Sequence, residues 1–207
     1  MSAPNFDSVA RLYRLLEYGA FGPALWRRRI AFLPEVTKAS RVLMAGEGDG
    51  RFLAVFLEAN PYAQVDYVDA SPVMADLARA RAGTHASRVR FQTGDVLGLS
   101  LPENHYDLIV THFFLDCFDS EQLSDLIGKL SRAATPMANL LVSEFRSPNA
   151  STRTIVHALY YFFGITTGLK PRKLTPHGPG LQRHGFRLAQ SQLSVGGLLT
   201  SELWSRQ

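Results

Sequence analysis

A glycine-rich turn follows the first strongly apolar run of the chain, and its spacing is typical of nucleotide binding. The turn lies in the stretch VLMAGEGDGRF and places Gly46, Gly48 and Gly50 at every second position. Glycine can adopt positive φ and lets a ligand approach the backbone closely, because no Cβ intervenes. A tight turn without a ligand would also use glycine, but it explains three alternating glycines poorly.

Two classes of ligand compete for this turn. A dinucleotide requires the pattern G-x-G-x-x-G, whereas this chain has G-x-G-x-G with Arg51 at the place of the third glycine. The carboxylates of Glu47 and Asp49 would repel a pyrophosphate but suit a cationic ligand. The sulfonium of S-adenosylmethionine meets this condition, so the turn favours that cofactor over a nicotinamide dinucleotide.

Two further acidic residues end the next two predicted strands. Asp69 lies about twenty residues after the glycines, where a carboxylate can accept hydrogen bonds from both ribose hydroxyls. The alternative is that Asp69 caps the helix beginning at Pro72, a role that Ser71 could also fill. Asp95 is expected within reach of the adenine amino group, and its alternative is an ordinary turn aspartate after Gly94.

The elements that must position these residues alternate regularly from residue 40 onward. Short runs rich in Val, Ile and Leu alternate with helical patterns, which is typical of parallel strands joined by crossover helices. The predicted strands are 41–45, 65–69, 89–93, 106–112 and 139–145. Helices are predicted at 51–59, from Ser71-Pro72 onward, and from Ser120 to about Arg132. A break in the chain is expected after the last helix, at Thr135-Pro136. Two further β-like runs, 186–195 and 198–204, are expected to form a hairpin joined at Gly196-Gly197.

The motifs VLMAGEGDGRF, YVDASPVMADLARAR, FQTGDV and YDLIVTHFFLDCF, taken in order, resemble the class I S-adenosylmethionine-dependent methyltransferases. The resemblance covers roughly residues 40–145. It implies a Rossmann-like, doubly wound α/β fold with a seven-stranded, mostly parallel sheet and an antiparallel last strand. This sequence departs from the family's commonest glycine motif, because Met44 stands where an acid is usual and Glu47 where a small residue or cysteine is usual.

The N-terminal stretch from Asn5 to Tyr13, followed by Trp26-Arg27, is similar to the leading helices of ubiquinone and menaquinone biosynthesis methyltransferases. That similarity implies helices that cover the cofactor, with Phe6, Tyr13 and Tyr18 lining the site. An aromatic packing stripe is the alternative for these side chains.

We therefore expect one domain, 1–207, with four parts: N-terminal cover helices (1–39), a cofactor-binding core (40–145), a helical insertion on the acceptor side (146–185) and a C-terminal hairpin (186–207). The residues predicted to contact the cofactor are Ala45, Gly46, Glu47, Gly48, Gly50, Asp69, Ala70, Asp95, Val96 and Thr111.

Methyl transfer can be accelerated largely by orientation and desolvation, so an obvious catalytic triad is not required. His112 ends the fourth predicted strand and is the candidate acid or base, because imidazole can take up a proton near neutral pH. The alternative is a hydrogen-bonded core histidine. Asp116 could orient His112 or cap the next helix, and Glu144 could reach the same crevice.

The apolar run 155–169 includes Tyr160 and Tyr161 and is predicted to be a helix with a broad aromatic surface. It favours a small, largely apolar or aromatic acceptor, although completing the core or a homodimer interface is an equal alternative. The segment from Lys170 to Gly180 is rich in Pro, Gly and basic residues and is interpreted as part of the insertion.

Composition narrows the remaining classes of function. The net charge of +4 comes from scattered basic residues, and the Arg27–Arg29 group is interpreted as a solvated helix face, so no specific nucleic-acid signal is present. We expect no secretory signal, no membrane span and no metal site, and the single Cys117 indicates a cytoplasmic location. Two alternatives stay open: an RNA or protein methyltransferase, supported by Lys170, Arg172, Lys173 and Arg183, and a cofactor-binding protein of the same fold that does not transfer methyl groups.

Overall fold

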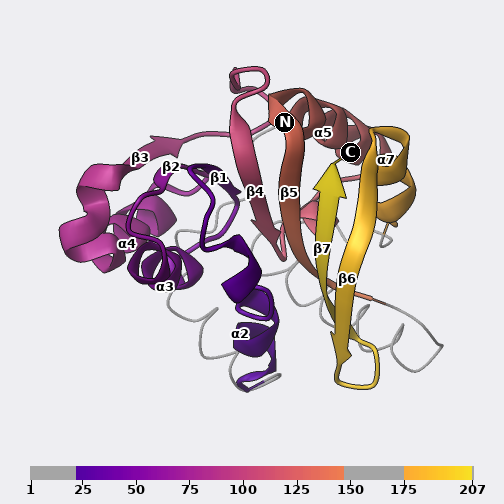
Figure 1. The fold of residues 1–207 in the computed structure, drawn as a ribbon, viewed down its shortest axis with the longest axis horizontal. Helices are drawn as coiled ribbons and strands as arrows, with labels where there is room; N and C mark the ends of the chain where they lie inside the picture. The colour runs from indigo at the N-terminus through magenta and orange to yellow at the C-terminus, as the bar shows by residue number, and fades with distance from the viewer. Residues whose placement is uncertain (1–21, 147–174, 207) are drawn as a thin grey trace.

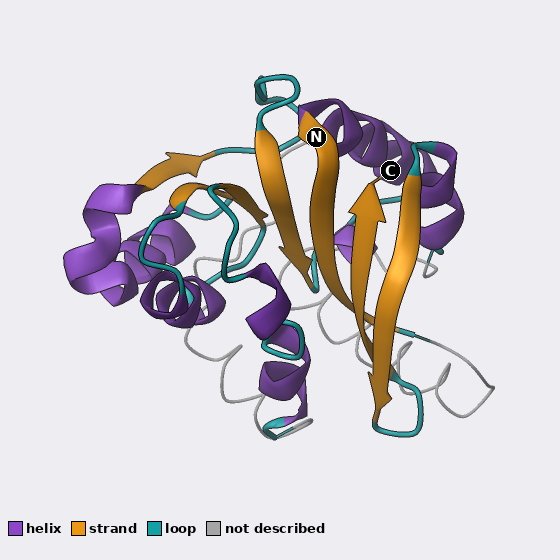
Figure 2. Ribbon diagram, viewed as in Figure 1, coloured by secondary structure: helices purple, strands orange, loops and turns teal. Residues whose placement is uncertain are grey.

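The computed structural model describes residues 22–146 and 175–206, which build one seven-stranded sheet with the strand order β3-β2-β1-β4-β5-β7-β6 (Figure 1). Strands β1 to β5 run parallel, and β7 runs antiparallel to both of its neighbours, β5 and β6. In Figure 2 the arrowheads of β4 and β6 accordingly point down and that of β7 points up. The predicted doubly wound sheet with an antiparallel last strand is confirmed. The strands are β1 (Arg41–Ala45), β2 (Gln64–Asp69), β3 (Val89–Thr93), β4 (Tyr106–His112), β5 (Ala134–Phe145), β6 (Phe186–Ser194) and β7 (Leu199–Arg206).

Both faces of the sheet are covered, as the continuous apolar runs predict. In β1, Val42 and Met44 belong to one apolar cluster, and Leu43 and Ala45 belong to another on the opposite face. Helices α3 (Arg51–Ala59) and α4 (Pro72–Ala82) cover the first face. Helices α5 (Ser120–Ala133) and α7 (Gly178–Arg183) cover the second face, behind the strands in Figure 1. The glycine turn that follows β1 therefore lies at the edge of a sheet that is covered on both faces.

Local sequence explains where the crossover helices begin. The Ser71 side chain accepts a hydrogen bond from the Met74 N–H at 3.2 Å, and Pro72 starts α4. Helix α5 begins with a capping box in which the Asp119 side chain accepts from backbone N–H groups while Gln122 reaches back to the Asp119 N–H. Asp119 therefore caps α5, which excludes the capping role considered for Asp116.

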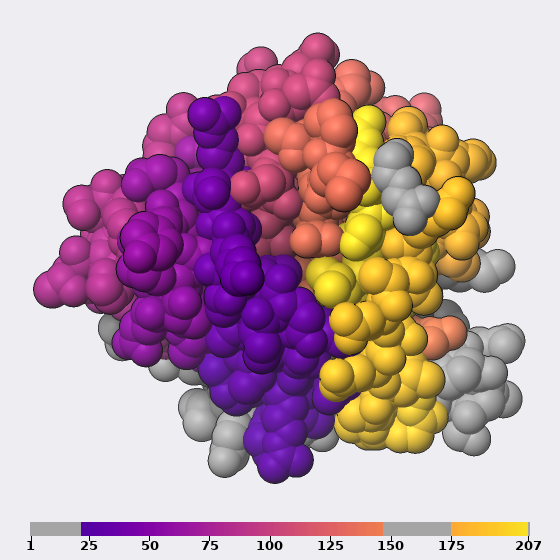
Figure 3. Space-filling view, viewed as in Figure 1, coloured from indigo at the N-terminus to yellow at the C-terminus, as the bar shows by residue number. Residues whose placement is uncertain are grey.

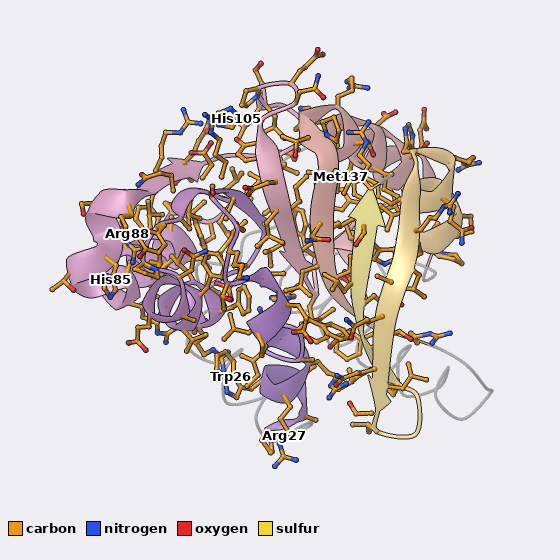
Figure 4. The ribbon with its side chains drawn as sticks, viewed as in Figure 1. Trp26, Arg27, His85, Arg88, His105 and Met137 are labelled. Carbon is orange, nitrogen blue, oxygen red and sulfur yellow. The ribbon has the colours of Figure 1, made fainter. Side chains whose placement is uncertain are left out.

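Helix α2 (Ala24–Arg29) packs on the sheet near β7 and corrects the interpretation of the arginine group. The hydroxyls of Ser143 and Ser201 both donate to the Arg28 carbonyl oxygen, and Figure 3 shows the indigo atoms of this segment against the yellow C-terminal strands. Arg27 points away from the body of the molecule (Figure 4), whereas Arg29 is only 8% exposed. The solvated-face interpretation is thus wrong for Arg29, because i and i+4 spacing places it on the same buried face as Leu25.

The start of one strand differs from expectation. Strand β5 begins at Ala134, directly after α5, although a break at Thr135-Pro136 and a strand start at residue 139 were expected. A register shift opposite Tyr106 and Leu108 accommodates the proline, and Met137 in this stretch has φ of +72°. Helix α7 lies within the predicted insertion 146–185, and its Leu181 is buried in the cluster beneath it.

Several expectations fall outside the described residues: the leading aromatic residues Phe6, Tyr13 and Tyr18, and the apolar helix at 155–169. The four-part division of the chain also stays a prediction. Within residues 22–146 and 175–206, no helix is long and apolar enough to cross a bilayer.

Candidate cofactor site

The glycine turn has the backbone conformation that its sequence predicts. Gly46, Gly48 and Gly50 have φ values of +65°, +80° and +79°. A Cβ at Gly46 would lie 1.9 Å from the Phe114 ring, and a Cβ at Gly50 would lie 2.5 Å from the backbone of Ala78. A Cβ at Gly48 would meet no described atom within 4 Å, so no described residue fills the space beside Gly48. Packing explains the outer two glycines, whereas the middle one borders a space that a ligand can fill.

Two side chains of β2 fix the position of Gly48. The Gly48 N–H donates to Asp69 Oδ2 at 3.0 Å, and the Tyr67 hydroxyl donates to the Gly48 carbonyl oxygen. Asp69 Oδ1 accepts from the Ser71 N–H at 2.9 Å. Because Ser71 caps α4, Asp69 is not the side-chain cap of that helix. Its carboxylate instead lies against the glycine turn, at the carboxyl edge of the sheet where a ribose was predicted.

The end of β3 meets the end of β2 at the same edge. The Gly94 N–H donates to the Asp69 carbonyl oxygen at 2.9 Å, which brings Asp95 close to Asp69 in the fold. The Asp95 side chain is exposed and accepts from the Leu97 N–H, as a turn aspartate does. Lys129 of α5 donates to the carbonyl oxygens of Val96 and Leu97 and anchors this loop. The turn role of Asp95 is therefore present, and its adenine contact stays a prediction.

The two acidic residues within the glycine turn both face arginines. Asp49 Oδ2 lies 2.6 Å from Arg81, and Asp49 Oδ1 lies 3.1 Å from Arg51. Burial alone would raise the pKa of Asp49, but these two arginines lower it overall. An arginine therefore lies beside each of the two carboxyl groups that the sequence predicts to favour a cationic ligand.

Glu47 turns inward, beneath the glycine turn. Its Oε1 accepts from the Phe52 N–H at 3.1 Å and lies 3.4 Å from Arg29 Nη1, which also donates to the Glu47 carbonyl oxygen. Burial raises the pKa of Glu47 to about 7, and the charge of Arg29 offsets this only in part. Glu47 Oε2 is buried without a hydrogen-bond partner among the described residues. Arg29 thus ties α2 to the turn, a contact that the sequence reveals only through the i, i+4 spacing with Leu25.

His112 lies at the end of β4 and is 1% exposed. Its ring is edge-on to Phe52 with centroids 4.6 Å apart, and neither ring nitrogen has a described hydrogen-bond partner. Burial, followed by the nearby charge of Arg29, lowers the pKa of His112 well below its usual value. The imidazole is therefore neutral. The alternative of a hydrogen-bonded core histidine finds no partner within the described chain.

The remaining predicted contact residues lie at the same edge. Ala45 and Thr111 are fully buried, Val96 is buried and Ala70 is exposed, while the Thr111 hydroxyl has no partner among residues 22–146 and 175–206. Glu144 Oε1 accepts from the Phe114 and Leu115 N–H groups at 3.0 and 2.7 Å, so it holds the loop that follows β4. Its position at the end of β5 was recognised in the sequence, but these contacts were not, since no local pattern links residues thirty positions apart.

Comparison with known proteins assigns the family. A family model described as a methyltransferase domain matches residues 42–137. The chain is 32% identical over 160 residues to the demethylmenaquinone methyltransferase of Thermus thermophilus, covering 77% of this chain and 69% of that protein. The chain belongs to the class I S-adenosylmethionine-dependent methyltransferases.

Two more distant similarities accompany this one. The EEF1A lysine methyltransferase 4 of Bos taurus is 27% identical over 188 residues, covering 81% of this chain and 69% of that protein. The solved structure of the mitomycin 7-O-methyltransferase MmcR superposes with a TM-score of 0.70 at 19% identity, covering 98% of this chain but 60% of that chain. At that identity the superposition shows a shared fold alone.

The cofactor of this methyltransferase is S-adenosylmethionine, and the described residues fit it. Gly48 leaves open the space that a Cβ would fill, and the Asp69 carboxylate lies directly beside it. Thr111 and His112 add buried polar atoms without described partners at the neighbouring strand end, and buried groups of this kind normally have a ligand or water as partner.

Proposed function

We propose that this methyltransferase transfers the methyl group of S-adenosylmethionine to a small, largely apolar or aromatic acceptor. The observation that carries the proposal is the open side of Gly48 beside the Asp69 carboxylate, at the carboxyl edge of a doubly wound sheet. Ligands of open α/β sheets bind in the crevice at this edge. The bound cofactor would supply an electrophilic methyl group.

Each residue of the site has a proposed role in holding the cofactor. The backbone of Ala45, Gly46, Glu47, Gly48 and Gly50 would lie against the aminoacyl end. The Asp69 carboxylate, with Ala70 beside it, would accept from the ribose hydroxyls. Asp95 and Val96 would face the adenine, and Thr111 would contact the cofactor from the end of β4.

His112 is the residue that we propose to take a proton from the acceptor. A neutral imidazole has a free lone pair, and the low pKa of His112 keeps it neutral throughout the physiological range. A pKa this low also makes the imidazole a weak base, so His112 would accelerate methyl transfer only modestly. His112→Asn should then spare cofactor affinity and slow transfer to acceptors that must lose a proton.

The nature of the acceptor draws support from the relatives. The Thermus relative is named for demethylmenaquinone, and the N-terminal stretch resembles quinone biosynthesis methyltransferases. We therefore propose a quinone-type aromatic acceptor as the first compound class to assay. A homodimer and a cytoplasmic location stay predictions of the same account.

A protein lysine is the second candidate acceptor, because the bovine relative that covers 81% of this chain is named as a lysine methyltransferase. The assay that separates the candidates measures transfer of a labelled methyl group from S-adenosylmethionine to reduced quinones and, in parallel, to lysine-containing proteins. The proposal expects turnover with the quinone set. Transfer to protein alone would replace it with the second candidate, and tight cofactor binding without any turnover would favour a non-transferring protein.

A further inference from the structure

The loop that follows β4 rests on the carboxyl group of Glu144. This loop, residues 113–118, begins at Phe113, which has φ of +54°, and continues into the short helix η3 (Leu115–Cys117). Glu144 is 2% exposed, and its Oε1 accepts from two consecutive N–H groups, those of Phe114 and Leu115. One oxygen atom therefore fixes the backbone direction at the point where the chain turns away from the sheet.

The same loop carries a ring to the glycine turn. The Phe114 ring lies so close to Gly46 that a Cβ on Gly46 would be 1.9 Å from it. The ring also packs against Phe118, with centroids 5.0 Å apart and planes nearly perpendicular. A continuous path of contacts thus runs from Glu144 through the Phe114 backbone and ring to the turn that binds the cofactor.

We propose that Glu144 is a positioning residue for the cofactor site, acting through Phe114 on Gly46. The inference rests on the proposed function, because it concerns the same site. Strand β5 is paired on both sides, with β4 and β7, so it is a rigid base for this side chain. A shift of the loop would free the space over Gly46 and change the shape of the turn.

The role needs the reach of this side chain and not its charge. Burial raises the pKa of Glu144 well above its usual range, and the negative charge of Asp116 adds to this effect, so both favour the neutral carboxyl group. A neutral carboxyl oxygen still accepts both N–H groups. Glutamine has the same length and keeps a carbonyl oxygen, whereas aspartate keeps the carboxyl group but is one methylene shorter.

Two substitutions separate positioning from an electrostatic or acid–base role. Glu144→Gln should bind S-adenosylhomocysteine within about threefold of the wild type, because both hydrogen bonds can be retained. Glu144→Asp should weaken binding by about tenfold or more. The two buried hydrogen bonds that hold the loop are lost, and this shifts the equilibrium between the held and the displaced loop by at least that factor. The opposite order, with weak S-adenosylhomocysteine binding by Glu144→Gln and normal binding by Glu144→Asp, would overturn the proposal.

A double-mutant cycle tests the route through Phe114. Phe114→Leu should also weaken binding, and Glu144→Asp combined with Phe114→Leu should be no weaker than the worse single variant, because coupled residues are not additive. Additive losses would contradict the route. Ser143→Ala, on the same strand but facing α2, is the matched control and should bind normally. If the wild type binds no S-adenosylhomocysteine, the proposed function fails, whereas normal binding by the wild type and by Glu144→Asp refutes only this inference.

Discussion

The Gly48 N–H donates to Asp69 Oδ2 at 3.0 Å, joining the glycine turn after β1 to the carboxyl end of β2. Asp69 thus serves two purposes in this account: it shapes the turn, and its carboxylate is the proposed ribose acceptor. A carboxylate has enough lone pairs for both.

Asp69→Ala is expected to weaken S-adenosylhomocysteine binding by about tenfold to a thousandfold, since hydrogen bonds to a charged group contribute about 1.5–3 kcal/mol each. Isothermal titration calorimetry would measure the loss. Asp66→Ala, on the same strand but paired with Arg90 and Tyr106 away from the turn, is the control and should bind as the wild type does. Unchanged affinity in Asp69→Ala would make the ribose assignment wrong.

The two glycines at positions 48 and 50 should respond differently to alanine. The new Cβ of Gly48→Ala meets no described atom, so only left-handed backbone strain should lower the free energy of unfolding, by about 1–2 kcal/mol. The same Cβ should reduce cofactor affinity strongly, because it occupies the proposed ligand space. Gly50→Ala adds a clash with the Ala78 backbone and should unfold at a clearly lower temperature. Thermal unfolding combined with ligand titration distinguishes the two effects, and equal destabilisation by both variants would argue against the open space at Gly48.

The pH dependence of stability should reveal the buried Glu47. Its pKa is raised to about 7 in the folded protein. The contribution of protonated Glu47 to the free energy of unfolding is therefore fully present below the pKa of an unfolded glutamate and is lost as the pH rises through about 7. Between about pH 5 and pH 8, the free energy of unfolding of the wild type should therefore fall by on the order of 1–3 kcal/mol relative to that of Glu47→Gln. Denaturant unfolding at several pH values measures this, and a constant gap between the two proteins would refute it.

Glu202 should show the opposite dependence. Burial alone would raise its pKa, but contacts with His177 at 2.7 Å, Trp204 and Thr200 lower it overall. Its contribution is present above the pKa of an unfolded glutamate, about 4.3, and is lost as the pH falls below that value.

At neutral pH, the free energy of unfolding of Glu202→Gln should be about 1–3 kcal/mol below that of the wild type. In urea unfolding this difference should shrink toward zero as the pH falls toward about 3. A difference that persists unchanged in acid would show that Glu202 acts through shape and not through charge.

The sequence predicts most of the sheet because its strand signals are local. Apolar runs, the Ser71-Pro72 helix start and the Gly196-Gly197 turn each act within a few residues, and all appear in the structure near their expected positions. Strand β5 was placed too late because pairing of Ala134 with Tyr106 extends it through a proline. Tertiary pairing overrode the local signal there.

The site was less accessible to sequence reasoning. The glycines and strand-end aspartates can be located in the sequence because their spacing along the chain reflects the strand order, and their contacts with the cofactor stay predictions. Arg29 was misread because a group of three basic residues conceals the buried position of its last member. The contacts of Glu144 depend on residues 29 and 30 positions away, and no short motif records such a distance.

Calorimetric titration of the folded protein with S-adenosylhomocysteine, and separately with NAD, tests whether the glycine turn binds the nucleoside and rejects a dinucleotide. We expect saturable one-site binding of S-adenosylhomocysteine that is lost in Gly48→Val, and no heat of binding with NAD. Binding of NAD, or no binding of S-adenosylhomocysteine by the wild-type chain, would contradict this expectation.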